Sequence, residues 1–163
     1  MKQSIVEVIA YLLELSTSQA ADVDSHFVDQ VIIKQRLEEA GFGKHVVSQA
    51  FDWLSELIEQ QHWYASNKLD PDAKSTKTLR IFSPEESARI DLEARNFILS
   101  MEHAGILDTN MREVVISQLM SLNQRLVELI DVKWVVLLVL MSKSNKNIQD
   151  LRGYLLATMA LEV

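Results

Sequence analysis

The stretch RIFSPEE at residues 80–86 contains the clearest helix start in the sequence. Ser83 is placed to accept a hydrogen bond from an amide of the first helical turn, and Glu86 is placed to reach back to the Ser83 amide. Pro84 suits the first helical position, because the N–H that proline lacks would have no helical partner there. Apolar residues then recur at helical spacing until a glycine. We therefore expect a helix from Pro84 to about Ala104.

A second strong signal is the apolar run WVVLLVLM at residues 134–141, which has no polar face. A helix there must be covered nearly all round by the rest of the protein. The run is too short for a bilayer, since a membrane-spanning helix needs ~20 apolar residues. A buried strand is the alternative, because periodicity is ambiguous in short runs. We predict a core helix containing Trp134, because the segments on both sides have helical patterns.

The first part of the chain has the pattern of three helices. Helical spacing of apolar residues places them at about Lys2–Ser16, Asp29–Ala40 and Lys44–Gln61. Asp29 has the residue type of an N-cap, and Gly41 followed by Phe42 is typical of a helix end. Because few residues separate the second and third helices, we expect a helical hairpin or a helix-turn-helix.

A β-hairpin is expected after the third helix. The segments HWYAS (62–66) and KTLRIF (77–82) flank the turn-rich sequence NKLDPDAKST (67–76). Both flanks are short and rich in aromatic or β-branched residues, which favours two strands joined by a mobile tip. Three helices followed by a hairpin is the element order of a winged helix. The alternative is an unstructured loop, which leaves an all-helical protein without a wing.

The remaining residues predict more helices. Asp108 or Thr109 is expected to cap one helix, and Ser144 or Asn145 to begin the last. The predicted fold is therefore mainly α, with a winged-helix-like unit of three helices and a hairpin over residues 1–83. A four-helix unit follows over residues 84–163. The alternative is that both halves share one core around Trp134.

Composition limits the classes of function. The 163 residues contain no cysteine, which excludes disulfides, a thiol nucleophile and thiolate metal sites. The N-terminal sequence MKQSIVEVIAYLLELS has acids at Glu7 and Glu14, which interrupt the apolar region that a signal peptide needs. With no candidate membrane span either, we expect a cytoplasmic protein. The net charge of −7 disfavours bulk attraction to nucleic acid or anionic lipid.

The basic side chains nevertheless gather in one segment. Residues 64–83 contain four basic and two acidic side chains, whereas residues 1–63 contain four basic and ten acidic ones. The residues expected to contact nucleic acid or a partner are Lys68, Lys74, Lys77 and Arg80, with Trp63 and Tyr64 nearby. Against phosphate binding, the third helix carries Asp52, Glu56 and Glu59, which would repel a nucleic-acid backbone.

No catalytic, metal or cofactor site is predicted. The sequence has no Gly-rich phosphate loop, no Gly-x-Ser-x-Gly elbow and no His-Glu-x-x-His. Its four histidines are isolated from one another, and we expect no metal ligand among them. The carboxylates that cluster after Ser83 are interpreted as structural, with Glu85–Arg89 and Asp91–Arg95 as i, i+4 ion pairs. We expect no cofactor and no enzymatic activity.

Several motifs resemble the Smg family of small bacterial proteins. They are Ala40-Gly41-Phe42, Ala50-Phe51-Asp52-Trp53-Leu54, Arg80-Ile81-Phe82-Ser83-Pro84-Glu85-Glu86, Arg112-Glu113 and Lys133-Trp134. The resemblance covers nearly the whole chain. Gly43 and Val132 depart from it, since the family more often has an acidic residue after Gly-Phe and leucine before Lys-Trp. The resemblance implies a cytosolic proteobacterial protein and supplies no activity or catalytic residues.

Two functional hypotheses remain. The first is a protein-interaction adaptor, because acidic faces beside apolar helical stripes suit a partner with a basic surface. The alternative is a nucleic-acid-binding protein that contacts phosphates through the basic hairpin. The sequence does not identify the protein partner or predict an oligomeric state, and it indicates no membrane contact.

Overall fold

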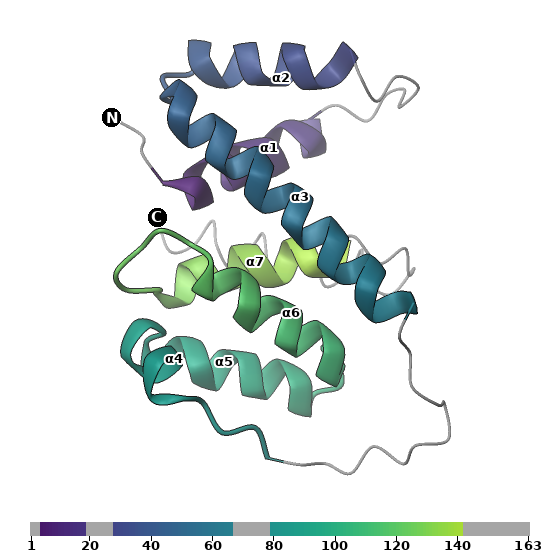
Figure 1. The fold of residues 1–163 in the computed structure, drawn as a ribbon, viewed down its shortest axis with the longest axis vertical. Coiled ribbons are helices and arrows are strands. Elements are labelled where there is room, and N and C mark those ends of the chain that lie inside the picture. Colours follow the sequence, from purple (N-terminus) through teal and green to yellow (C-terminus); the bar gives the residue numbers. More distant parts are fainter. Residues whose placement is uncertain (1–3, 19–27, 67–78, 142–163) are drawn as a thin grey trace. The chain divides into compact units, whose positions relative to one another are not determined.

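The computed structural model describes residues 4–18, 28–66 and 79–141. These residues form seven helices and no strand, which confirms the mainly α fold (Figure 1). In chain order the helices are α1 (Ile5–Ser18), α2 (Val28–Glu39), α3 (Lys44–Ser66), α4 (Pro84–Arg89), α5 (Leu92–His103), α6 (Thr109–Met120) and α7 (Leu129–Met141).

The chain divides into two compact units, Met1–Ser55 and Glu56–Val163. These are called the first and second units below, and each is described by itself. The boundary before Pro84, which rested on the strong helix start there, stays a prediction. The predicted last helix, beginning at Ser144 or Asn145, lies outside the described residues.

In the first unit, the turn between α2 and α3 follows the predicted pattern. Gly41 has a φ of +99°, a left-handed conformation that favours glycine. Its amide donates to the Glu38 carbonyl at 3.1 Å, and the Phe42 amide donates to the Leu37 carbonyl at 3.1 Å. These paired bonds satisfy the last carbonyls of the helix. The Phe42 ring folds back and packs edge-on against Tyr11 of α1 at a centroid distance of 5.7 Å.

One predicted helix start in the first unit is wrong. Helix α2 begins at Val28, so Asp29 lies inside the first turn and is not the residue before it. The predicted first helix is confirmed, because α1 is helical and buries apolar residues that include Val8, Ile9 and Leu13. On α2 the inward-facing Leu37 is fully buried.

The predicted hairpin is wrong in its first strand. Residues 62–66 continue α3, which runs unbroken from Lys44 to Ser66. The helical conformation of α3 thus continues through five residues whose composition favours a strand, as happens when the fold overrides weak local preferences. The described part of the second flank, residues 79–82, is not a strand either, so the winged-helix pattern is not supported. Residues 67–78 lie outside the described part.

One long helix was expected after Ser83, and the structure has two. The capping box is confirmed, since Glu86 N–H donates to the Ser83 hydroxyl at 3.1 Å and Ser83 N–H donates to the Glu86 carboxylate at 2.9 Å. The helix breaks at the fully buried Ile90, whose backbone is extended. There the Asp91 amide donates to the Val127 carbonyl at 3.0 Å, and the Val127 amide donates to the Arg89 carbonyl at 2.7 Å. This parallel bridge replaces helical hydrogen bonds and separates α4 from α5.

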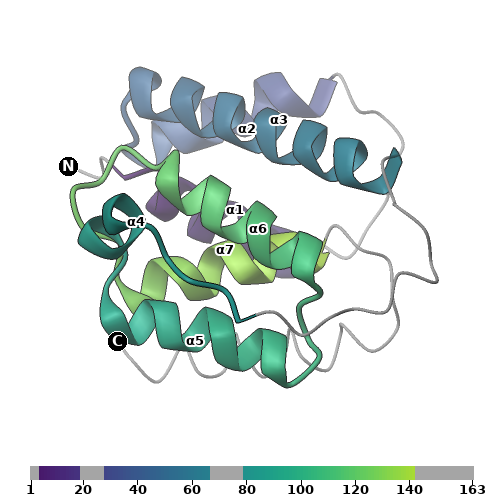
Figure 2. The ribbon, with the colours of Figure 1, turned by 60° about the horizontal axis from the view of Figure 1, so that its bottom comes forward.

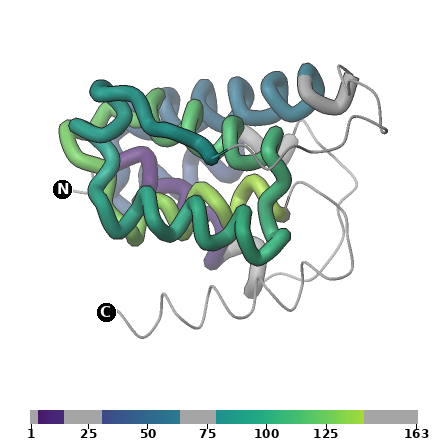
Figure 3. The backbone as a smooth tube through the Cα atoms, turned by 90° about the horizontal axis from the view of Figure 1, so that it is seen from below, coloured from purple at the N-terminus to yellow at the C-terminus, as the bar shows by residue number. Residues whose placement is uncertain are grey.

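Helix α7 forms the centre of the second unit. Helices α5 and α6 both pack against it and against each other (Figures 2 and 3). The predicted core helix is confirmed, because its side chains at 132, 135, 136 and 137 are fully buried. Trp134 itself is half-buried, so it is not the centre of that core. None of the helices in the described ranges is long and apolar enough to cross a membrane.

Candidate functional site

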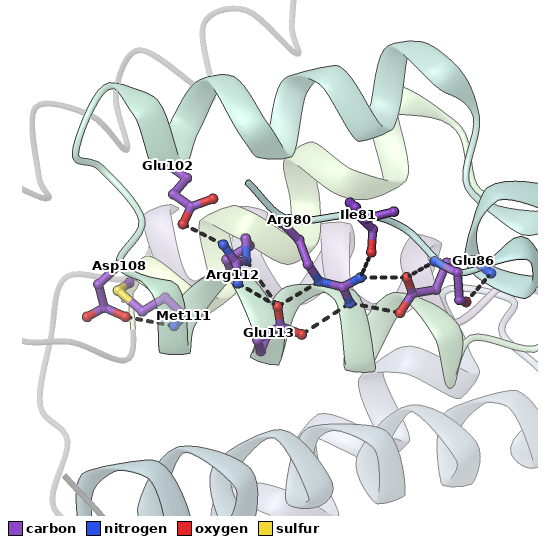
Figure 4. Close-up of polar contacts among 9 residues, drawn as sticks. Arg80, Ile81, Glu86, Glu102, Asp108, Met111, Arg112 and Glu113 are labelled. Atoms are coloured by element: carbon purple, nitrogen blue, oxygen red, sulfur yellow. Dashed lines mark hydrogen bonds and ion pairs between the residues drawn. The ribbon is translucent and has the colours of Figure 1, made fainter. Parts of the chain in front are cut away.

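Arg80 is the centre of an ion-pair network in the second unit (Figure 4). Its Nε and Nη2 donate to the two oxygens of Glu113 at 2.9 and 3.2 Å. Its Nη1 and Nη2 donate to the two oxygens of Glu86 at 3.0 and 2.9 Å, and Nη1 also donates to the Ile81 carbonyl. A guanidinium has five N–H groups, so these bonds use every donor that Arg80 has.

Glu113 joins Arg80 to a second arginine. Its Oε1 accepts from the Nε and Nη2 of Arg112 at 3.0 and 2.8 Å, and the Nη1 of Arg112 donates to Glu102 at 2.6 Å. The Arg112 side chain is buried and comes from α6, whereas Glu102 comes from α5. The network therefore links α4, α5 and α6 to the segment that precedes α4.

The pKa values in the network favour its charged forms. The hydrogen bond from Arg80 is the main reason why the pKa of Glu86 lies below its ordinary value. Burial alone would raise the pKa of Glu113, but the hydrogen bonds from Arg80 and Arg112 outweigh burial and lower it. Hydrogen bonds to Glu113 and Glu86 also raise the pKa of Arg80. Glu86, Glu113 and Arg80 are thus charged at neutral pH.

The segment 79–83 alternates between the interior and the solvent. Arg80 is mostly buried, and the Phe82 ring lies near two guanidinium groups, with the Arg80 Cζ at 5.4 Å and the Arg95 Cζ at 5.9 Å from its centroid. Leu79 and Ile81 point the other way, with 83% and 79% of their surfaces exposed. Figure 4 shows Arg80 directed towards the two glutamates.

The second half of α3 has a different exposed surface. Within the second unit it consists of Glu56, Ile58, Glu59, His62 and Trp63, which we call the α3 patch. Ile58 is 55% exposed and Trp63 is 60% exposed. The neighbouring Leu57 is buried, and the Gln60 side chain bonds to Ser117 of α6. Two acidic and two large apolar side chains therefore share this surface.

The contact residues expected from the sequence are not brought together by the described structure. Lys68, Lys74 and Lys77 lie outside the described residues. Trp63 and Tyr64 both lie in α3, and only the Trp63 side chain is described. Arg80 is held in the network, so a phosphate contact would have to break existing ion pairs. Their binding role stays a prediction.

The expected i, i+4 ion pairs are wrong for the two arginines concerned. Arg89 does not pair with Glu85: it donates to the carbonyls of Met120, Leu122 and Gln124 at 2.7, 2.7 and 2.9 Å. Arg95 donates to the Ile90 carbonyl at 3.1 Å and to the Ser87 hydroxyl at 3.3 Å. Arg89 therefore caps the carboxyl end of α6.

Histidine and carboxylate side chains that lie close together can hold a metal ion. The ranges that the structure describes contain no group of three or more such side chains. The carboxylates that do cluster, Glu86, Glu102 and Glu113, are each paired with an arginine.

The structure defines a small protein of two compact helical units, in which arginine–glutamate pairs join separate helices. The chain belongs to the family described as "Protein of unknown function (DUF494)", whose model matches residues 5–159. The resemblance to the Smg family is confirmed by relatives named "Protein Smg homolog".

Two of these relatives indicate the degree of similarity. The protein from Methylococcus capsulatus is 39% identical over 152 residues, which cover 91% of this chain and 88% of the relative. The protein from Alkalilimnicola ehrlichii is 41% identical over 147 residues, covering 90% of this chain and 88% of the relative. No solved structure is significantly similar to this chain.

Proposed function

We propose that this chain is a non-enzymatic adaptor that binds a partner protein in the cytoplasm through the α3 patch. The carrying observation is that Trp63 and Ile58, two large apolar side chains, are more than half exposed on one helix end. Tryptophan is enriched among the residues that contribute most to protein interfaces. Apolar side chains with acidic neighbours form a surface that a protein partner can desolvate.

The backbone beneath the α3 patch is held in place. Gln60 of this helix bonds to Ser117 of α6, which ties the helix to the rest of the second unit. A rigid helix presents its outer side chains without a large loss of conformational entropy on binding. This arrangement supports a preformed contact surface.

The charge of the α3 patch favours a basic partner. Glu56 and Glu59 are both exposed, and the whole chain has a net charge of −7. Carboxylates repel phosphates and attract lysine and arginine side chains, which raises the association rate with a basic protein surface. The same charges oppose contact between α3 and a nucleic-acid backbone.

The proposal that the protein has no enzymatic activity is supported by the use of its charged groups. General acids and bases need a pKa near the working pH. The pKa values of Glu86 and Glu113 are lowered by arginine hydrogen bonds and lie further from neutrality than the ordinary value. These carboxylates are therefore poor proton donors and are better suited to joining helices.

Affinity capture with the full chain tests this proposal. Wild type, Trp63→Ala and Glu59→Lys are used as baits in a cell extract, with and without nuclease, and Ala88→Ser is the matched exposed control in α4. We expect a partner protein that survives nuclease treatment, is retained by the control and is lost with both patch variants. Loss of all partners with nuclease would instead support the alternative, nucleic-acid binding through Lys68, Lys74 and Lys77. Capture that is unchanged by both patch variants would refute the α3 patch.

A further inference from the structure

One side of the α3 patch combines an exposed carboxylate with an exposed indole. Glu59 and Trp63 are four residues apart on α3, so their side chains are neighbours on one face of the helix. Glu59 is exposed, and 60% of the Trp63 surface is exposed. Building on the adaptor function proposed above, we propose that this pair binds an arginine side chain of the partner protein. The guanidinium stacks on the indole and forms an ion pair with the carboxylate.

The first support is the charge beside the indole. Glu56 lies three residues before Glu59 on α3, so a second exposed carboxylate follows on the same face. No arginine or lysine in the described part of the chain pairs with either of them. The last turn of α3 has no basic side chain, and the carboxyl end of a helix carries a partial negative charge. The surface around Trp63 therefore attracts a cation.

The second support is that the same unit already holds a guanidinium in this way. Arg80 forms forked bonds to Glu86 and Glu113 (Figure 4), and its Cζ atom lies 5.4 Å from the centroid of the Phe82 ring. Glu59 and Trp63 supply the same two kinds of group, a carboxylate and an aromatic ring. The described part of the chain supplies no guanidinium to them. An arginine of another protein completes the set.

The geometry favours arginine over lysine. Side chains four residues apart on a helix have Cβ atoms roughly 5–6 Å apart, so a carboxylate and an indole at that spacing can contact one guanidinium together. The planar guanidinium stacks on an aromatic face while its N–H edge donates to a carboxylate, whereas the lysine ammonium is a compact and strongly hydrated charge. An exposed cation–π contact and an exposed ion pair each change an affinity by a few-fold, so both together should change it by about tenfold.

NMR titration of the full chain with three short peptides tests the proposal. Each peptide has one variable residue between leucines, and this residue is arginine, lysine or citrulline, the uncharged analogue of arginine. The indole N–H signal of Trp63, assigned by its loss in Trp63→Phe, reports binding at the site. We expect the arginine peptide to shift this signal with a dissociation constant about tenfold below that of the citrulline peptide. It should also lie several-fold below that of the lysine peptide.

Two variants that lose the same charge separate the site from the net charge of the chain. Glu59→Gln should reduce the preference for arginine over citrulline to about threefold or less. Glu93→Gln, which removes an exposed carboxylate of α5, should leave that preference unchanged. Trp63→Leu keeps an apolar side chain but removes the ring, so the preference for arginine over lysine should disappear, as followed by the backbone amides of α3. Circular dichroism checks that each variant retains its helices.

Four results would overturn the proposal. They are no shift of the Trp63 signal with the arginine peptide, equal binding of all three peptides, equal binding of the arginine and lysine peptides, and equal losses of preference in Glu59→Gln and Glu93→Gln. The second identifies a purely apolar surface, the third a general attraction of cations, and the fourth an effect of net charge.

The peptide titration and the capture experiment can fail separately, because the peptides do not require the partner protein. A captured partner that depends on the α3 patch, together with peptides that show no preference for arginine, would refute the arginine site and leave the adaptor function. A preference for arginine at Glu59 and Trp63, together with capture that the patch variants leave unchanged, would refute the adaptor function and leave the arginine site.

Discussion

Replacing Arg89 with methionine is expected to destabilise the second unit by about 3–5 kcal/mol. In the wild type the guanidinium donates to three backbone carbonyls, those of Met120, Leu122 and Gln124, at 2.7–2.9 Å. A hydrogen bond from a charged donor contributes roughly 1.5–3 kcal/mol. Water recovers part of that loss because the site is only partly buried, so the sum is smaller than three full bonds. Methionine keeps most of the apolar stem, which isolates the loss of the donors.

The sequence-based interpretation predicts a much smaller loss of stability when Arg89 is replaced. If Arg89 only paired with Glu85 on the exposed face of α4, its loss would cost about 0.3–0.5 kcal/mol and would be screened by salt. The structure therefore predicts an effect about ten times larger than the exposed ion pair would give, and one that salt changes little. Glu85→Ala is the matched control, and its expected cost is near zero because the Arg89 donors bind carbonyls.

Urea unfolding followed by far-ultraviolet circular dichroism measures this difference. The midpoint of thermal unfolding should fall by about 10 °C, since 1 kcal/mol corresponds to roughly 2–4 °C in a protein of this size. Hydrogen exchange at the amides of α6 and of the loop after it locates the loss. A cost below about 1 kcal/mol for Arg89→Met, or an equal cost for Glu85→Ala, would refute the carbonyl-capping role.

Acid should remove the contribution of the ion-pair network, because the folded-state pKa values of Glu86 and Glu113 lie below the ordinary 4.5. Their stabilisation is present above pH 4.5 and is lost as the pH falls through the folded-state pKa values. Glu113→Gln should be about 2–4 kcal/mol less stable than wild type at pH 7, and the two should approach equal stability in acid. A difference in stability that stays constant with pH would contradict this. Asp131 has the opposite sign, since burial raises its pKa above 3.8: its contribution is fully present below pH 3.8 and is lost as the pH rises through the folded-state value. In urea unfolding at pH 7, Asp131→Asn should therefore leave the stability unchanged or raise it. A large loss of stability would show that burial does not destabilise the charged carboxylate. Gly41→Ala should lower the stability by about 1 kcal/mol, because Gly41 has a φ of +99°. Gly43→Ser should leave the stability unchanged or raise it, because serine is a good N-cap for α3. Equal changes in the midpoint of thermal unfolding would exclude the backbone explanation.

Features that depend on a few neighbouring residues were predicted correctly from the sequence. The capping box at Ser83, the glycine stop at Gly41 and the helical core run around Val136 each follow from side chains within one or two helical turns. In such cases the partner of each backbone group is close in the chain, so residue type and spacing are sufficient.

Features that depend on distant residues were missed. The break at Ile90 arises from hydrogen bonds with Val127, and Gln60 of α3 donates to Ser117, 57 residues away. Arg89 looked like the partner of Glu85 because only the local carboxylate is visible in the sequence. The carbonyls that bind it lie more than 30 residues further along the chain. No periodic pattern signals such contacts.

The candidate site shows the same division between local and distant information. Trp63 was predicted as a contact residue because it is an aromatic residue near a basic segment. It is exposed, but it lies on a helix and not on a hairpin. Arg80 was grouped with the lysines because of its charge. Its decisive partner, Glu113, lies 33 residues away, so the sequence had no means of showing that the guanidinium is already fully bonded.

The segment 79–83 inverts the usual distribution of apolar and charged side chains. A charged residue, Arg80, faces the interior, while the aliphatic Leu79 and Ile81 face solvent. A register shift by one residue would bury both aliphatic side chains and release the arginine to water, which the hydrophobic effect alone would favour. The ion pairs with Glu86 and Glu113 fix the opposite register. The outward position of Leu79 and Ile81 therefore follows from the ion pairs of Arg80 and not from the hydrophobic effect.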